Sequence, residues 1–160
     1  MWQELLDILT KLGKEYQALA GLGQQKHAAL VGVDLKTLER LLKREEDIAK
    51  SVQALEQQRQ ALFIRLYKAV PSASKEMQAR DIYKLASPPF PGRLQAAHDQ
   101  LGRLADQVKE QREVNNLLAQ GALGAVNVRL GQIGGTSVDP IYGRGGGEHV
   151  SPHQNFEFKA

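Results

Sequence analysis

The side chains with the clearest spacing for metal chemistry are two histidines near the C-terminus. His149 and His153 lie four residues apart, which on a helix would place two imidazoles on one face, where they could bind a metal ion. Gly147, Ser151 and Pro152 surround them, however, and no helix is expected there. We interpret them as two solvated histidines. The chain has no cysteine, which excludes disulfides and thiolate metal sites. The sequence therefore predicts no metal and no cofactor.

No other group of residues has the pattern of a catalytic site. The segment YGRGGGE at 142–148 is rich in glycine, but it lacks the Gly-Lys-Ser/Thr of a phosphate-binding loop, and no strand is expected before it. Glu45 and Glu46 lie in a charge-rich helix, while His27 and His98 stand alone on what the pattern predicts to be polar helix faces. Because catalysis needs polar groups that converge in a cleft, we expect a protein that is not an enzyme.

The composition favours helices that pack on helices. Of the 160 residues, 42% are hydrophobic but only 6% are aromatic, so the apolar content is mostly leucine, alanine and valine. A β-sandwich would need more β-branched and aromatic residues in alternation. The length suits one domain with a modest core.

Charge and hydropathy narrow the partners and the location. The 21 Lys and Arg are interleaved with 18 Asp and Glu, for a net charge of +3, and mixed charge of this kind is typical of solvated helix faces rather than of a nucleic-acid interface. The N-terminus lacks the pattern of a signal peptide, and no window approaches the roughly 18 consecutive apolar residues of a membrane span. We expect a cytoplasmic protein that does not insert into a membrane or bind nucleic acid.

Apolar residues three and four positions apart predict a long first helix. Its stripe consists of Trp2, Leu5, Leu9, Leu12, Tyr16 and Leu19, the spacing of a helical bundle or coiled coil. Gly32 is expected to end this helix in the left-handed conformation, and Asp34 to cap the next one. So short a connection predicts two antiparallel helices packed as a hairpin.

The second helix is predicted from about Leu35 to about Ala69, with apolar residues repeating every seven positions. Glu45 and Arg59 interrupt the second apolar row of this heptad repeat. Polar residues at such positions can fix the register in which helices pack. Pro71 then ends the helix. We expect a crossover with a short helix that Ser74 could cap.

The third long helix is predicted to begin near Pro91. Its stripe begins with Leu94, Leu101, Leu104, Val108 and Leu118 and continues through Leu123, Val126, Leu130 and Ile133, among the glycines Gly121, Gly124 and Gly131. Each internal glycine costs roughly 1 kcal/mol of helix stability relative to alanine. The helix is too long for the first two to cover, so the stripe from Leu123 to Ile133 is interpreted as a surface for a partner helix.

From Gly134 onward the chain changes character. Six glycines and two prolines lie there, with one adjacent apolar pair, Ile141 and Tyr142. We therefore predict an all-α fold, an elongated antiparallel bundle or coiled coil of three long helices with a short crossover helix in residues 1–133. Residues 134–160 are predicted to form a flexible C-terminal tail rich in glycine and proline.

In this organisation the chain resembles the FlgN-type family of flagellar export chaperones over about residues 1–143. The resemblance rests on the long first helix, the short VGVD turn and the charged second helix. It also rests on the brief crossover, the segment EVNNLLAQGALGAVNVRL of the third helix, and a tail bearing IYG. The basic charge departs from the pattern, because secretion chaperones are more often acidic.

The resemblance implies a non-enzymatic cytoplasmic chaperone. Such proteins bind the C-terminal helical segments of hook–filament junction (hook-associated) proteins and bring them to the export gate in the membrane. The residues that match the client-binding region are Leu118, Leu123, Val126, Leu130 and Ile133. Ile141 and Tyr142 match a tail element that clamps the client or docks on the export gate.

A second interpretation stays open from the residues alone. The chain could be a structural coiled-coil adaptor with a permanent homo- or hetero-oligomeric assembly, for instance a homodimer through the third helix. A soluble complex with a junction protein's C-terminal segment would distinguish the chaperone from the adaptor.

Overall fold

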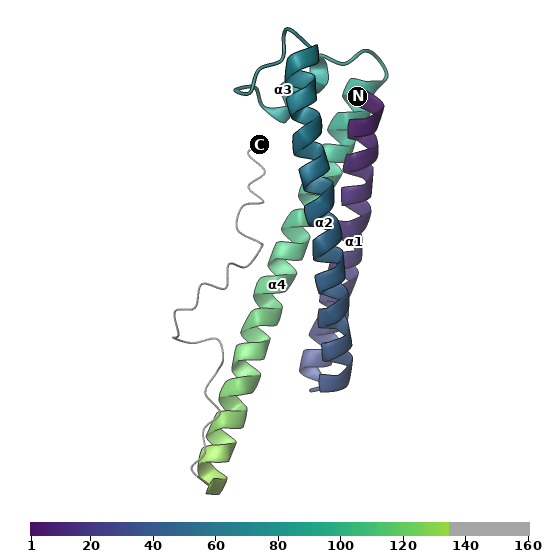
Figure 1. Cartoon of the computed structure of the whole chain (residues 1–160). Helices are drawn as coiled ribbons and strands as arrows, with labels where there is room; N and C mark the ends of the chain where they lie inside the picture. Colours follow the sequence, from purple (N-terminus) through teal and green to yellow (C-terminus); the bar gives the residue numbers. More distant parts are fainter. Residues whose placement is uncertain (135–160) are drawn as a thin grey trace.

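The computed structural model describes residues 1–134, and in this range it is entirely helical apart from turns and loops. Three long helices, α1 (Trp2–Val31), α2 (Leu35–Ala69) and α4 (Phe90–Gly134), run along one another, and the short helix α3 (Ala79–Lys84) lies in the crossover (Figure 1). The predicted all-α bundle of three long helices and a short crossover helix is confirmed for these residues. The predicted tail lies outside the described residues.

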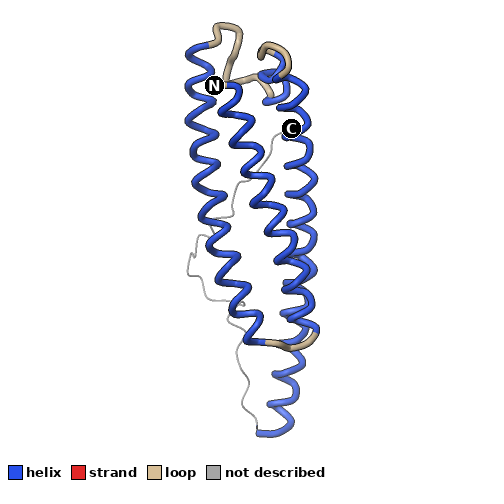
Figure 2. The backbone as a smooth tube through the Cα atoms, turned by 90° about the vertical axis from the view of Figure 1, so that its right-hand side faces the viewer, coloured by secondary structure: helices blue, strands red, loops and turns tan. Residues whose placement is uncertain are grey.

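The central helix of the bundle is α1. It packs against both α2 and α4, and Figure 2 shows it between them. Among the described residues, no Cα atom of α2 comes within 8 Å of one in α4. The bundle is therefore built on one helix with two neighbours, and α4 depends on α1 for its position.

The main core lies toward the end of the bundle that carries α3. Leu5, Leu9 and Leu12 of α1 are fully buried there, and so are Leu94 and Leu101 of α4. Full burial of one such side chain stabilises a fold by about 1.5–3 kcal/mol. This end of the bundle fixes the direction in which α4 leaves it.

The turn between α1 and α2 differs from the prediction in one residue. Asp34 caps α2 as predicted, because its side chain accepts a hydrogen bond of 3.0 Å from the Thr37 amide, which lowers the pKa of Asp34. Gly32, however, has φ −80° and is not left-handed. Val33 takes the left-handed conformation, with φ 52°.

The reason is that α1 continues one residue further than predicted. The Asp34 amide donates to the Ala29 carbonyl at 2.9 Å, and the Gly32 amide still donates in helical fashion to Ala28 at 3.0 Å. In such a helix ending the left-handed residue directly precedes the amide that closes the motif, and that residue is Val33.

The crossover also differs from the prediction. Ser74 does not cap α3: its carbonyl accepts a hydrogen bond of 3.2 Å from Met77 in a separate turn, and Gln78 precedes the helix without a side-chain cap. Pro91 lies in the first turn of α4, where the missing amide proton is not needed.

Candidate functional site

The predicted client-binding residues continue the core-facing side of α4 beyond the hairpin. Leu130 follows Leu94 by 36 residues, or about ten helical turns, and Val126 follows Val108 by 18 residues, or about five turns. In the first half of the helix this side is buried against α1. Farther along, the α1–α2 hairpin ends and α4 runs on alone (Figures 1 and 2).

None of these residues is fully buried, and Val126 and Ile133 are the most exposed. Leu118, Leu123 and Leu130 are half-buried, whereas 49% of Val126 and 77% of Ile133 are exposed. The residues from Leu123 to Ile133 therefore lie on a part of α4 that the first two helices leave uncovered, whereas Leu118 lies beside the end of the hairpin. Its role in binding stays a prediction.

A second apolar feature, which the sequence analysis missed, lies where the hairpin turn meets α4. Eight residues line an open groove there, three from the hairpin and five from α4: Leu30, Val31, Val33, Val114, Leu117, Leu118, Gly121 and Ala122. Its volume is about 510 Å³, within the range of ligand-binding pockets. We call it the hairpin groove.

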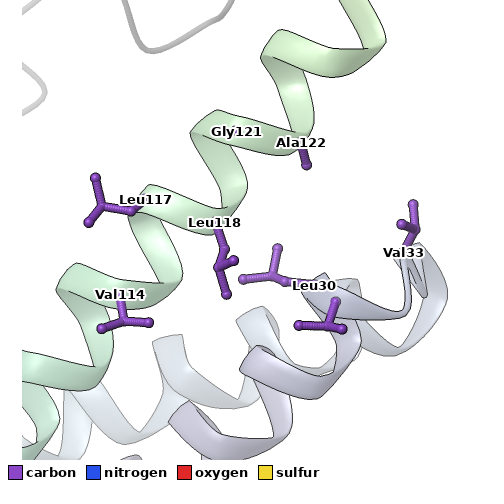
Figure 3. Close-up of a pocket in the computed structure, with 8 residues that line it drawn as sticks. Leu30, Val33, Val114, Leu117, Leu118, Gly121 and Ala122 are labelled. Atoms are coloured by element: carbon purple, nitrogen blue, oxygen red, sulfur yellow. The ribbon is translucent and has the colours of Figure 1, made fainter.

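The lining of the hairpin groove is apolar and open to solvent. In Figure 3, Leu30 and Leu118 point toward one another across the space between the turn and α4. Val33 and Leu117 border the groove and are 68% and 69% exposed. Gly121 has no atom within 4 Å of the place where a Cβ would stand, so it leaves room for an incoming side chain.

A hydrogen bond from Asn115 and close packing of Gln111 at Gly23 position α4 against α1 near the groove. The Asn115 amide nitrogen donates to the Gly23 carbonyl at 2.9 Å. A Cβ at Gly23 would stand 2.6 Å from Oε1 of Gln111, so the absence of a side chain lets the helices come close. On the other side of α1, an ion pair between Lys26 and Glu45 of α2 joins the two helices of the hairpin.

Charged side chains become rare along α4 from the groove onward. Between Val114 and Gly134 the only charged side chain is Arg129, and no charged residue lines the hairpin groove. Exposed apolar surface without charge is typical of an interaction site. The surface suits an apolar partner and has no feature that would bind phosphate or nucleic acid.

A group of buried polar side chains lies within the main core, away from the groove. Glu56 is 6% exposed and forms an ion pair of 2.8 Å with Arg59. His98 was expected on a polar face, but it is 5% exposed, and its Nδ1 lies 3.1 Å from the Tyr83 hydroxyl. The prediction was wrong because α3, whose place the sequence does not indicate, covers this side of α4.

Burial is the main influence on the ionisation of this group. It lowers the pKa of His98, with Arg80 acting in the same direction. It also raises the pKa of Tyr83 to about 12 and that of Tyr16 to about 12. These side chains face one another in the packed interior rather than a cleft, so we assign them to the stability of the fold.

The remaining predicted residues lie outside the described part of the chain. They are Ile141, Tyr142, His149 and His153. Within residues 1–134, no cluster of three or more potential metal ligands occurs, and none of the four helices is both long enough and apolar enough to span a bilayer.

Only one wall of the groove has a signal in the sequence. Val114, Leu117, Leu118 and Gly121 recur at three- and four-residue steps, which describes a second apolar side of the same helix. The other wall, Leu30 to Val33, is more than 80 residues away in the chain. Only the folded structure brings the two together.

Comparison with known proteins identifies the chain at the level of the family. The family model described as "FlgN protein" matches residues 1–149. No curated protein and no solved structure gives a significant match.

Proposed function

The chain belongs to the FlgN family of flagellar export chaperones, and from this premise we propose which clients it binds and where. The clients are hook–filament junction (hook-associated) proteins, bound by their C-terminal helical segments. The chaperone keeps these segments from assembling early in the cytoplasm and delivers them to the export gate.

The observation that carries the proposal is the exposed apolar end of α4. Val126 and Ile133 lie on the uncovered continuation of the core face, and Arg129 is the only charge in this segment. An amphipathic client helix that packs there would take the place of the missing neighbour helix. Each side chain that it covers completely contributes about 1.5–3 kcal/mol.

The glycines of this segment suit reversible binding. Gly121, Gly124 and Gly131 each lower the stability of the helix by roughly 1 kcal/mol relative to alanine. Ordering the helix end on the client uses part of the binding free energy. The complex is therefore weaker than its buried area suggests, as an export chaperone that must release its client requires.

The tail residues Ile141 and Tyr142 enter the proposal through the family resemblance. In the complex they clamp the client or dock on the export gate. Replacing both with serine should weaken one of these two interactions and leave the other unchanged. Binding assays with the client segment and with the soluble domain of the export gate would separate the two roles.

The test of the client site is a pair of substitutions four residues apart. In the variant Val126→Asp with Leu130→Asp, client binding would place two unpaired carboxylates in an apolar interface. We expect at least a hundredfold weaker binding of a junction protein's C-terminal segment in isothermal titration calorimetry. The free protein should unfold at nearly the same temperature as the wild type.

A matched control comes from the polar side of the same helix segment. Asn116→Asp with Gln120→Asp adds the same charge at two exposed positions with the same spacing, and should bind the client normally. If the Val126/Leu130 variant binds with unchanged affinity, the client site is elsewhere. If the wild type ignores the segment and forms a stable oligomer instead, the chain is an adaptor and the proposal fails.

A further inference from the structure

The hairpin groove is not part of the predicted stripe, and only Leu118 belongs to both. Along α4 the groove extends from Val114 to Ala122, before the uncovered end that we assign to the client. Its apolar lining stands open within residues 1–134, and no described element packs over it. A surface of this kind needs an occupant.

The chain itself continues for 26 residues beyond Gly134. Ile141 and Tyr142 are the only adjacent apolar pair in this continuation. Gly134 is the last residue of α4 and Gly135 follows it, and two consecutive glycines allow the chain to reverse sharply. Asp139 precedes Pro140, and a residue before proline favours extended backbone.

The number of residues between Gly134 and the Ile141–Tyr142 pair can be compared with the length of α4 between Gly134 and the hairpin groove. An extended chain advances about 3.3 Å per residue and a helix about 1.5 Å, so each returning residue passes roughly 2.2 residues of α4. Ile141, seven residues after Gly134, therefore reaches a point beside residues 118–119. Tyr142 reaches a point beside residues 116–117.

We propose that the tail folds back along α4 and places Ile141 and Tyr142 in the hairpin groove of the same chain. The open space at Gly121 leaves room for part of the pair, and Leu30 and Leu118 lie beside it. The occupant is a segment of the chain itself because the linker is long enough for the pair to reach the groove and short enough to keep it close by. A second copy or a client helix would have no such length relation.

One consequence rests on the proposed function. Because Leu118 belongs to both surfaces, a client that covers Leu118 competes with the tail, and the tail is released when the client binds. Docking of the tail in the free protein does not depend on the client. A failure of one proposal is therefore distinguishable from a failure of the other.

The absence of cysteine from the natural sequence makes disulfide trapping a direct test. The full-length variant Gly121→Cys with Gly143→Cys places one thiol in open space in the groove and the other beside the intact Ile141–Tyr142 pair. The control, Gly121→Cys with Asn155→Cys, carries its second thiol far beyond the pair. Both are oxidised in dilute solution, and the rate of intramolecular disulfide formation is measured.

An undirected tail would favour the first pair by no more than about fourfold, since the segments beyond Gly134 are nine and 21 residues long and effective concentration falls roughly as the −3/2 power of linker length. Docking should favour it by more than tenfold. A ratio of about four or less in the free protein would overturn the proposal. So would disulfide-linked dimers whose yield rises with protein concentration, because then a second copy occupies the groove.

Filling the groove gives a second readout. In Gly121→Leu the new side chain is much larger than the cysteine of the trapping variant and fills the open space at Gly121. The tail should therefore be displaced, and trypsin should cut after Arg144 several times faster than in the wild type. Gly131→Leu makes the same change at another open position of α4 and should leave the rate unchanged. Equal rates in all three proteins would contradict docking.

Discussion

The two halves of α4 differ in how many charged side chains they carry and in how far their apolar side chains are buried. Residues 90–113 carry eight charged side chains, and residues 114–134 carry one. In the first half, the charges mark the solvated sides, and the apolar side is buried, with Leu94 and Leu101 at 0% exposure. In the second half, apolar side chains point in several directions, and Leu117, Val128 and Ile133 are all more than 60% exposed.

This difference shows how a long helix can be stable at one end and available at the other. A helix that is apolar on all sides is normally buried, and here the hairpin is too short to bury it. The first half supplies the folding free energy and holds the second half in place. The second half then presents two apolar surfaces, the predicted client stripe and the hairpin groove.

The strongest test of the comparison makes the same substitution once in each half. Leu101→Ala removes a fully buried side chain and should lower the free energy of unfolding by about 2–5 kcal/mol. Leu117→Ala removes one that is 69% exposed and should change it by less than about 0.5 kcal/mol. Urea unfolding followed by circular dichroism measures both, and similar losses would mean that the second half belongs to the core.

Substitutions at two glycines test the same comparison, and their effect on stability should be smaller. Gly121→Ala adds a methyl group in open space and should stabilise the helix locally by up to about 1 kcal/mol, slowing amide exchange nearby about fivefold. Gly23→Ala should give a smaller gain, because the Gln111 side chain would have to shift to make room for the methyl group. If the two substitutions slow amide exchange equally, α1 and α4 are not in close contact at Gly23.

The smallest expected effect is a pH dependence confined to the first half. Burial lowers the pKa of His98, and Arg80 and Arg59 act in the same direction, whereas Asp99 opposes them. The Tyr83 hydroxyl of α3 contacts the His98 ring. The unfolded chain therefore binds a proton at His98 more readily than the folded protein. Stability should fall as the pH drops below the unfolded value of about 6.5, until the lower folded value has been passed.

The variant His98→Gln provides the control for this titration. Its unfolding temperature should vary less between pH 7 and pH 5 than that of the wild type. If both proteins lose the same stability over this range, the acid sensitivity comes from other groups.

The helices were predictable because their signals are local. Asp34 and Pro71 set the limits of α2, and the predicted range from Leu35 to Ala69 is the observed one. Ser74 was wrongly predicted as a cap, because a serine in a turn has the same local pattern as a serine at a helix start. The burial of His98 depends on where α3 packs, which no local pattern indicates.

The same distinction between local and long-range signals applies to the candidate site. The exposed stripe from Leu123 to Ile133 could be predicted because it follows from helix period and helix length. The hairpin groove could not, because it depends on the level along α4 at which the hairpin turn lies. That level is set by contacts such as the hydrogen bond between Asn115 and Gly23.

The turn between α1 and α2 also has an energetic consequence. A β-branched residue in the left-handed region costs roughly 1–2 kcal/mol, and a glycine at position 33 would avoid it. The chain instead has valine there, with φ 52°, and glycine one position earlier, where an ordinary helical conformation makes no use of it. Strain of this kind persists where function rewards it, and the Val33 side chain borders the hairpin groove. The tip of the hairpin is thus less stable than its sequence could make it, and an apolar side chain stands there beside α4.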